Sequence, residues 1–132
     1  GQLQALPVWE LKMDKLPEDA RKIATERVKW SRKYQDKYGI TSEKAKNLPA
    51  GKAEEIQHLA KRVYRTLGLS GYARVDFRVD REGRPTILEV NVNPCLNPDA
   101  GFAAAAAQGG LSYRDLIGSI IDAAPRALQA IA

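Results

Sequence analysis

The sequence has few of the residues that mark secreted or membrane proteins. It contains one cysteine, Cys95, and one histidine, His58, among 132 residues. A single cysteine cannot form an internal disulfide, and no apolar run approaches the roughly 18 residues of a membrane span. No signal-peptide pattern opens the chain. The sequence therefore indicates neither a disulfide scaffold nor action in a membrane, and a cytoplasmic protein is the expectation.

Positive charge is in excess, and much of it lies in one segment. The net charge is +5, and residues 12–46 interleave basic with aromatic side chains. These include Arg21, Lys22, Arg27, Lys29, Arg32, Lys33, Lys37, Trp30, Tyr34 and Tyr38. Such a pattern can follow a phosphate backbone and stack bases, but Glu18, Glu26 and Asp36 in the same segment dilute its field. Nucleic-acid binding is therefore an alternative function and not the leading one.

Two segments in the second half of the chain alternate polar and apolar side chains as half-buried strands do. They cover residues 72–79 and 86–93, and the polar stretch 80–85 lies between them. Gly83 in that stretch can take the positive φ of a tight turn. The pattern predicts a β-hairpin with its turn centred on Glu82 and Gly83.

The predicted turn fixes which residues face each other across the hairpin. Opposed residues then have numbers that sum to 165, and any other parity of register would turn charged side chains toward the core. The expected pairs are Arg74 with Asn91, Val75 with Val90, Asp76 with Glu89, and Phe77 with Leu88. Ile87 is expected on the polar side, beside Glu89.

The polar face of this hairpin is the main candidate for a functional site. Opposed side chains on antiparallel strands have Cβ atoms about 4.5 to 5.5 Å apart, so Asp76 and Glu89 could share a cation. With Asn91 they form a set of oxygen donors that suits Mg²⁺ better than zinc. The alternative is a solvated sheet face on which Arg74 and Arg78 neutralise the two carboxylates.

The rest of the chain predicts an α+β fold, an antiparallel β-sheet flanked by helices in a single domain. We expect an edge strand over 3–13, interrupted by Pro7, and a long polar region over 14–49 with only short helices. The clearest helix covers 51–67 and is expected to lie on the apolar face of the hairpin. A rigid loop over 93–99 leads to helices over 100–108 and from 113 to about 130, with a break at Pro125.

The hairpin motif resembles the metal-binding end of the ATP-grasp ligases. The resemblance rests on Arg-x-Asp at 74–76, thirteen residues from Asp76 to Glu89, and Glu-x-Asn followed by a Pro-containing loop. The stretches 67–77 and 110–117 are especially similar to the D-alanine--D-alanine ligase branch. The resemblance is strong over about 50–122. It is weaker upstream, where Lys29 and Trp30 resemble the lysine and aromatic residue of an active-site loop.

The resemblance implies ATP-dependent activation of a carboxylate with ATP and two Mg²⁺ or Mn²⁺ ions. Glu89 would bridge the two ions, with Asp76 on one and Asn91 on the other. Arg74 would be the catalytic residue, stabilising an acylphosphate and the oxyanion formed when an amine attacks it. Lys29 would contact the ATP phosphates with Trp30 packed beside it; the alternative is that Lys29 is an ordinary surface lysine.

The loop after Asn91 departs from the family pattern. The family usually has Asn-Thr-x-Pro-Gly and a downstream hydroxyl, whereas Asn91 here is followed by Val92, Asn93, Pro94 and Cys95. Asn93 and Cys95 fall in the loop that binds the second substrate, and Cys95 is expected to be a buried or spectator thiol, not a nucleophile. The resemblance implies small-molecule carboxylate and amine substrates as partners, but this departure leaves open which carboxylate and which amine are joined.

The family's adenine-binding elements lie upstream of the part matched here. The expectation is a C-terminal fragment of an ATP-grasp domain that needs the N-terminal portion of its polypeptide and is inactive alone. A non-catalytic nucleotide- or metal-binding module is the alternative. A homodimer is left open.

Overall fold

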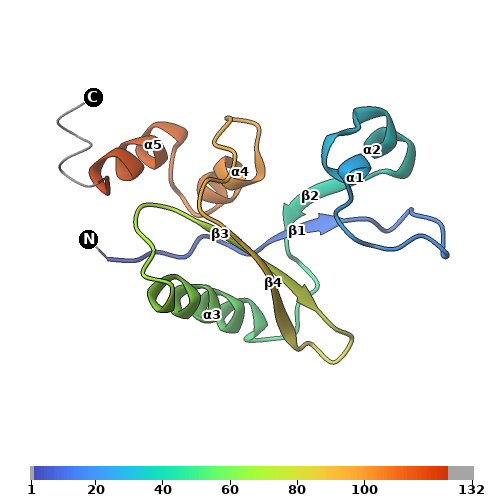
Figure 1. Cartoon of the computed structure of the whole chain (residues 1–132), viewed down its shortest axis with the longest axis horizontal. Coiled ribbons are helices and arrows are strands. Elements are labelled where there is room, and N and C mark those ends of the chain that lie inside the picture. The colour runs from blue at the N-terminus through green and yellow to red at the C-terminus, as the bar shows by residue number, and fades with distance from the viewer. Residues whose placement is uncertain (1, 125–132) are drawn as a thin grey trace.

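The computed structural model describes residues 2–124 and has an α+β fold, as predicted (Figure 1). It contains two separate antiparallel pairs of strands, β1 with β2 and β3 with β4. The strands are β1 (Trp9–Lys12), β2 (Thr41–Lys44), β3 (Arg74–Val79) and β4 (Pro85–Asn91). The helices are α1 (Glu26–Trp30), α2 (Arg32–Tyr38), α3 (Lys52–Thr66), α4 (Gly101–Gln108) and α5 (Tyr113–Asp122).

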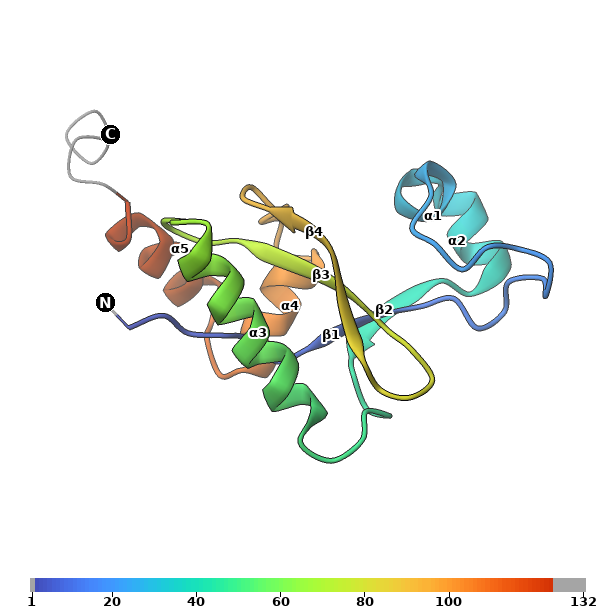
Figure 2. The same ribbon diagram turned by 60° about the horizontal axis from the view of Figure 1, so that its bottom comes forward.

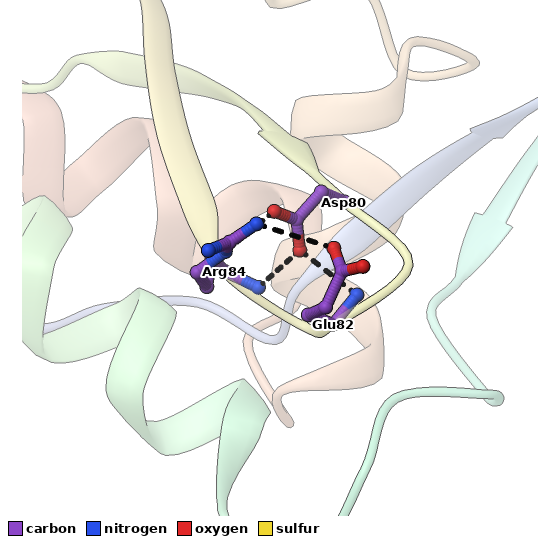
Figure 3. Close-up of polar contacts among 3 residues, drawn as sticks. All are labelled: Asp80, Glu82 and Arg84. Atoms are coloured by element: carbon purple, nitrogen blue, oxygen red, sulfur yellow. Dashed lines mark hydrogen bonds and ion pairs between the residues drawn. The ribbon is translucent and has the colours of Figure 1, made fainter.

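The turn of the β3–β4 hairpin is one residue longer than predicted. Asp80 and Arg84 close it, because the Asp80 amide donates to the Arg84 carbonyl at 3.1 Å. The Asp80 carboxylate also accepts the backbone amides of Glu82 and Arg84 at 3.0 and 2.8 Å (Figure 3). Gly83 takes the positive φ of 79° that ends a three-residue loop of this kind. This turn gives opposed residues whose numbers sum to 164.

A β-bulge at Leu88 accounts for the difference between the register near the turn and the register at the other end of the hairpin. Phe77 pairs with Ile87 and not, as predicted, with Leu88, whereas Asp76 still pairs with Glu89. Leu88 is therefore the extra residue of β4, and its side chain is 63% exposed. The prediction was right from Arg74 to Asp76 and wrong from Phe77 onward. Ile87 consequently faces the apolar side of the hairpin, not the polar side.

Strand β2 lies in the region that was expected to hold only short helices. It pairs with β1, with Trp9 opposite Lys44 and Lys12 opposite Thr41. Its residues, Thr-Ser-Glu-Lys, have no apolar alternation to reveal a strand. The Trp9 indole donates to the Ser42 hydroxyl at 3.2 Å, and Lys12 pairs with Glu43 at 2.8 Å. These side-chain contacts, which a local pattern cannot show, accompany the pairing.

The main apolar core lies between α4 and α5. Ala103, Ala106 and Leu116 are buried there, with Leu6 and Phe102 packed against them. The small alanine side chains of α4 leave room for Leu116 of α5 to pack against them. The N-terminal segment joins this core to α3, since the Gln57 side chain donates to the Leu6 carbonyl at 2.8 Å.

Helix α3 lies beside the hairpin, as predicted, but covers it incompletely (Figure 2). An open groove of about 370 Å³ remains between α3 and β4. Its lining residues are Leu59, Arg62, Val63, Thr66, Leu67, Ile87 and Val90. Leu67 is 56% exposed and Ile87 46% exposed. The hairpin therefore presents apolar surface that residues 2–124 do not bury.

The last helix is shorter than the prediction within the described part of the chain. It ends at Asp122 with Ala123 as its C-cap, before Pro125. The expected continuation to about residue 130, with its break at Pro125, lies outside the described residues. Within residues 2–124, none of the helices has the length and hydropathy that a membrane span requires.

Candidate functional site

The polar face of the β3–β4 hairpin brings together the four residues that the sequence predicted. Asp76 is the direct partner of Glu89, and Arg74 is the direct partner of Asn91. Both pairs lie on the side of the bulge where the predicted register is right. Two carboxylates, an amide and a guanidinium therefore lie on one face at the carboxyl end of β4, on two pairs separated by the Val75–Val90 pair.

Arg74 and Asp76 form a bidentate ion pair along β3. The Arg74 Nε and Nη2 atoms donate to Asp76 Oδ1 and Oδ2 at 2.6 and 2.9 Å. The hydrogen bonds to the Asp76 carboxylate are the main reason why the pKa of Arg74 is raised above its ordinary value. Partial burial acts in the opposite direction, and the negative charges of Asp76 and Glu89 add to the increase. Arg74 thus stays cationic and is fixed on the face where the candidate ligands lie.

Glu89 is not neutralised in the same way. No hydrogen bond or ion pair joins its carboxylate to another side chain within residues 2–124. Arg78, the second cation of the predicted ion-paired face, is engaged elsewhere, because its Nη1 donates to the Lys22 carbonyl at 2.7 Å. The ion-paired alternative therefore applies to Asp76 only. The Glu89 carboxylate is exposed and is available to bind a cation.

The donor set on this face fits a hard divalent cation. Asp76 and Glu89 offer carboxylate oxygens and Asn91 an amide oxygen, which are the ligands that Mg²⁺ takes in proteins. A carboxylate has about four acceptor positions, so the Arg74 pair leaves Asp76 with capacity to bind. Among residues 2–124 no group of three or more His, Cys, Asp and Glu gathers. The site therefore depends on these two carboxylates together with Asn91.

The loop after β4 is held by hydrogen bonds to Asn91 at the end of β4 and to Tyr72, which lies just before β3. The backbone amide of Asn93 donates to Asn91 Oδ1 at 2.8 Å. The Tyr72 hydroxyl donates to Asn93 Oδ1 at 2.9 Å. Pro94 is fully buried, while Cys95 is exposed, so of the two alternatives for this thiol, buried or spectator, the first is wrong. Tyr72 and Asn93 thus extend the polar face beyond the Arg74–Asn91 pair.

Tyr72 has the same position in the strand alternation as Arg74 and Asp76, but the sequence did not predict a role for it. The signal was present, because Tyr72 and Asn93 also have numbers that sum to 165. They continue the register of Arg74 with Asn91 beyond the last ladder pair. The Tyr72 ring also packs edge-on against Phe102 of α4, with centroids 5.6 Å apart.

Lys29 and Trp30 lie apart from this polar face. Both are on α1, which lies with α2 at one end of the molecule, away from the carboxyl end of β4 (Figures 1 and 2). Trp30 is 76% exposed. The α1–α2 corner is built by Gln35, whose amide donates to the carbonyls of Val28 and Lys29 at 2.8 and 3.2 Å. The structure therefore does not bring Lys29 together with Asp76 and Glu89.

Three cations of the basic segment lie around one depression on α1 and α2. Arg27, Lys33 and Lys37, with Ser31 and Tyr34, line a depression of about 280 Å³. None of these three cations pairs with a carboxylate within the described residues. The depression is separate from the hairpin face.

Comparison with protein families gives a match over most of the chain. The family described as "D-ala D-ala ligase C-terminus" matches residues 11–122. The chain is 40% identical over 78 residues to a D-alanine--D-alanine ligase of Bordetella petrii, covering 59% of this chain and 24% of that protein. It is 35% identical over 95 residues to one of Cupriavidus pinatubonensis, covering 69% of this chain and 29% of that protein.

The fold is also similar to solved structures of such enzymes. A D-alanine--D-alanine ligase from Bacillus anthracis complexed with ATP is 31% identical, with a TM-score of 0.58. The match covers 63% of this chain and 28% of that chain. A second structure of the ligase from Bacillus anthracis has a TM-score of 0.60 at 29% identity, over 70% of this chain and 30% of that one. The chain thus spans less than a third of the length of these relatives.

Proposed function

Because the chain belongs to the D-ala D-ala ligase C-terminal family of ATP-grasp proteins, we propose that it carries the metal-binding half of an ATP-dependent carboxylate-amine ligase. The observation that supports this most directly is the pairing of Asp76 with Glu89 on one rung. Like charges directly opposite each other are destabilising in a sheet. A bound cation would remove that cost and explain why the Glu89 carboxylate has no hydrogen-bond or ion-pair partner among residues 2–124.

The proposed reaction joins a carboxylate to an amine in two steps. The γ-phosphoryl group of ATP passes to the carboxylate oxygen, giving an acylphosphate and ADP. The amine nitrogen then attacks the acyl carbon, and phosphate leaves as the amide forms. Asp76, Glu89 and Asn91 would hold Mg²⁺, with Glu89 shared between two ions. When bound, these ions neutralise charge on the phosphoryl oxygens.

Arg74 is the proposed catalytic residue of this face. Its guanidinium is fixed by the two bonds to Asp76, and Nη1 makes no hydrogen bond within the described residues. A preorganised cation aimed at a developing negative charge costs no reorganisation when the reaction occurs. Arg74 would therefore stabilise the acylphosphate and the oxyanion formed when the amine attacks.

Nucleotide binding would need parts of the polypeptide that this chain does not supply. We propose that Lys29 contacts the ATP phosphates and that Trp30 packs beside it once α1 lies over the hairpin. The relatives are more than three times as long as the region matched here. The 132 residues would thus be one part of an ATP-grasp domain, inactive alone, that works with an N-terminal portion in a cytoplasmic enzyme.

Divalent-ion binding by the hairpin tests the proposal directly. In the ¹⁵N-labelled chain, Mn²⁺ should broaden the backbone signals of Asp76, Glu89 and Asn91 before those of other residues, and Mg²⁺ should compete. Glu89→Gln should weaken Mn²⁺ binding by about tenfold or more, since a charged ligand is lost. Glu82→Gln, at the turn end of the same hairpin, is the matched control and should bind as the wild type does.

Two results would count against this function. Equal weakening by Glu89→Gln and Glu82→Gln would show a diffuse charge effect and no site. Oligonucleotide binding that is sensitive to salt, ignores Mg²⁺ and survives Glu89→Gln would favour the basic segment and the nucleic-acid alternative. A stand-alone binding module would instead retain Mn²⁺ and nucleotide binding without any upstream portion.

A further inference from the structure

Helix α3 presents an apolar stripe to the groove beside β4, and residues 2–124 leave part of it uncovered. Leu59, Val63 and Leu67 recur at intervals of four residues and therefore share one face of the helix. Ile87 and Val90 line the opposite wall, and none of the lining residues comes from β3. Leu67 and Ile87 remain about half exposed. The groove thus lies on the apolar face of the hairpin, on the side of β4 that faces away from β3.

The backbone edge of β4 on that side is also unpaired. Within residues 2–124, β4 pairs only with β3, and no further hydrogen bond reaches its backbone. Such an edge presents a row of N–H and C=O groups to which another strand can pair, and a two-stranded sheet gains stability from a third strand. Pro85 has no amide, and the bulge at Leu88 interrupts the ladder. Pairing is therefore available mainly over Glu89–Asn91.

Arg62 gives the groove one charge that has no partner. Its guanidinium makes no ion pair or hydrogen bond within the described residues, and Thr66 is the other polar residue of the lining. An apolar occupant with a carboxylate placed against Arg62 would therefore match this surface. Sites for small ligands instead have several polar groups that converge on one point, and this lining lacks them.

One extended chain segment satisfies all three features. Its backbone would pair with β4 while every second side chain points into the groove, as in peptide recognition by strand addition. We propose that a strand from the N-terminal portion of the same polypeptide pairs with β4 and fills the groove, with an acidic side chain against Arg62. This inference rests on the proposed function, which requires that portion, and names the surface that it contacts.

The N-terminal segment of the chain lies close to this surface. The Gln57 side chain of α3, two residues before Leu59 of the groove, donates to the Leu6 carbonyl. The segment runs past this helix in Figure 2. A segment that precedes it in the proposed polypeptide would therefore emerge beside α3. The relatives are more than three times as long as the region matched here, so the proposed portion is long enough to reach β4.

Hydrogen exchange followed by mass spectrometry tests the contact in two forms of the protein. They are the 132-residue chain, at a concentration where it is monomeric, and the complete polypeptide that its gene encodes. Exchange over residues 86–91 should be at least about tenfold slower in the complete polypeptide, because a strand ladder protects both of its partners. The turn, residues 80–84, lies outside the groove and should exchange alike in both forms.

Arg62→Glu and Arg65→Glu form a matched pair, because both arginines are exposed on α3 and only Arg62 lines the groove. In the complete polypeptide, Arg62→Glu should speed exchange over residues 86–91 by about fivefold, since it sets like charges against each other. Arg65→Glu should leave it unchanged. Leu67→Lys should speed it by about tenfold, because docking would bury an ammonium group. Circular dichroism of the 132-residue chain should show that each variant folds as the wild type does.

The outcomes distinguish this inference from the proposed function. Equal exchange over residues 86–91 in the two forms would overturn it. Protection that rises with the concentration of the complete polypeptide would also overturn it, because a second copy would then cover the groove. Equal effects of Arg62→Glu and Arg65→Glu would contradict the acidic side chain. Asp76 and Glu89 lie on the other face of the hairpin, so their broadening by Mn²⁺ tests the proposed function separately.

Discussion

Asp80 is a single residue whose charge determines the geometry of the hairpin turn. Its carboxylate accepts the Arg84 and Glu82 amides and also the Arg84 guanidinium, the last at 2.7 Å (Figure 3). The hydrogen bonds from Arg84, backbone first and side chain second, lower the pKa of Asp80 below its ordinary value. The ionised carboxylate thus favours the folded state.

The sign of the resulting pH dependence follows from that lowered pKa. A carboxyl group with a lower pKa in the folded state contributes stability above its unfolded-state pKa. The contribution is lost as pH falls through the folded-state value. Between about pH 2 and pH 6, Asp80→Asn should be less stable than the wild type at the upper end, and the difference should vanish at the lower end.

Thermal unfolding followed by circular dichroism across this pH range would measure the effect. Asp99→Asn is the matched control, because Asp99 is an exposed carboxylate that makes no hydrogen bond within residues 2–124. It should unfold as the wild type does throughout. A gap between Asp80→Asn and wild type that widened toward low pH would contradict the role given to the Asp80 charge.

At the scale of elements, the β3–β4 hairpin shows how far the sequence could predict the candidate site. A turn centred on Glu82 and Gly83 predicted that Asp76 faces Glu89 and that Arg74 faces Asn91, and both pairs are confirmed, because the extra residue at the bulge offsets the longer turn. The position of Gly83 did not reveal the length of the turn. The length of the turn depends on which backbone amides donate hydrogen bonds to the Asp80 side chain. The alternation of polar and apolar residues in the strands does not show which amides these are.

The other elements also differ in whether the sequence could predict them. Helix α3 was predictable because its apolar residues recur with the helical period. Strand β2 was not, because its pairing with β1 accompanies long-range contacts such as Lys12 with Glu43. Tyr72 went unassigned since its partner Asn93 is 21 residues away and its anchor, Phe102, is on α4. Local periodicity thus predicted elements, and tertiary contacts decided the remainder.

The bulge at Leu88 leads to a prediction about the whole hairpin. Deleting Leu88 should preserve every pair on both sides of it, because Ile87 already faces Phe77 and Glu89 already faces Asp76. The variant should fold with a stability change of about 1 kcal/mol or less. Deleting Val90, which is not at the bulge, should shift Asn91 out of register and cost about 2 kcal/mol or more.

Denaturant unfolding and cross-strand NMR distances between Asp76 and Glu89 would check both deletions. Those distances should be unchanged without Leu88 and lost without Val90. Loss of the Asp76–Glu89 contact on deleting Leu88 would mean that the bulge is required for the carboxylates to face each other.

At the scale of the whole molecule, the open groove between α3 and β4 is a liability for the separate chain. Leu67 and Ile87 expose apolar surface there, and β3 and β4 form a sheet of only two strands. Exposed apolar patches and unpaired strand edges promote association between copies. We therefore expect the average mass of the chain to rise with concentration.

Sedimentation velocity over a range of concentrations would measure this association. Leu67→Lys, which places a charge in the groove, should lower the dependence on concentration. Trp30→Lys removes more exposed apolar surface but lies on α1, away from the groove, and should leave it unchanged. If both variants acted equally, general surface hydrophobicity and not the groove would be responsible.

The bond from Arg78 to the Lys22 carbonyl has a further consequence for the long polar region. The pairing of β1 with β2 closes most of that region into one loop. The Arg78 contact attaches this loop, near its middle, to β3, the strand that carries Asp76. Once the Arg78 contact has formed, each of the two shorter segments has less conformational entropy left to lose than one long loop whose middle is unrestrained. In the proposed approach of Lys29 to the hairpin, this tether would shorten the stretch of chain that has to move and so reduce the conformational search of α1.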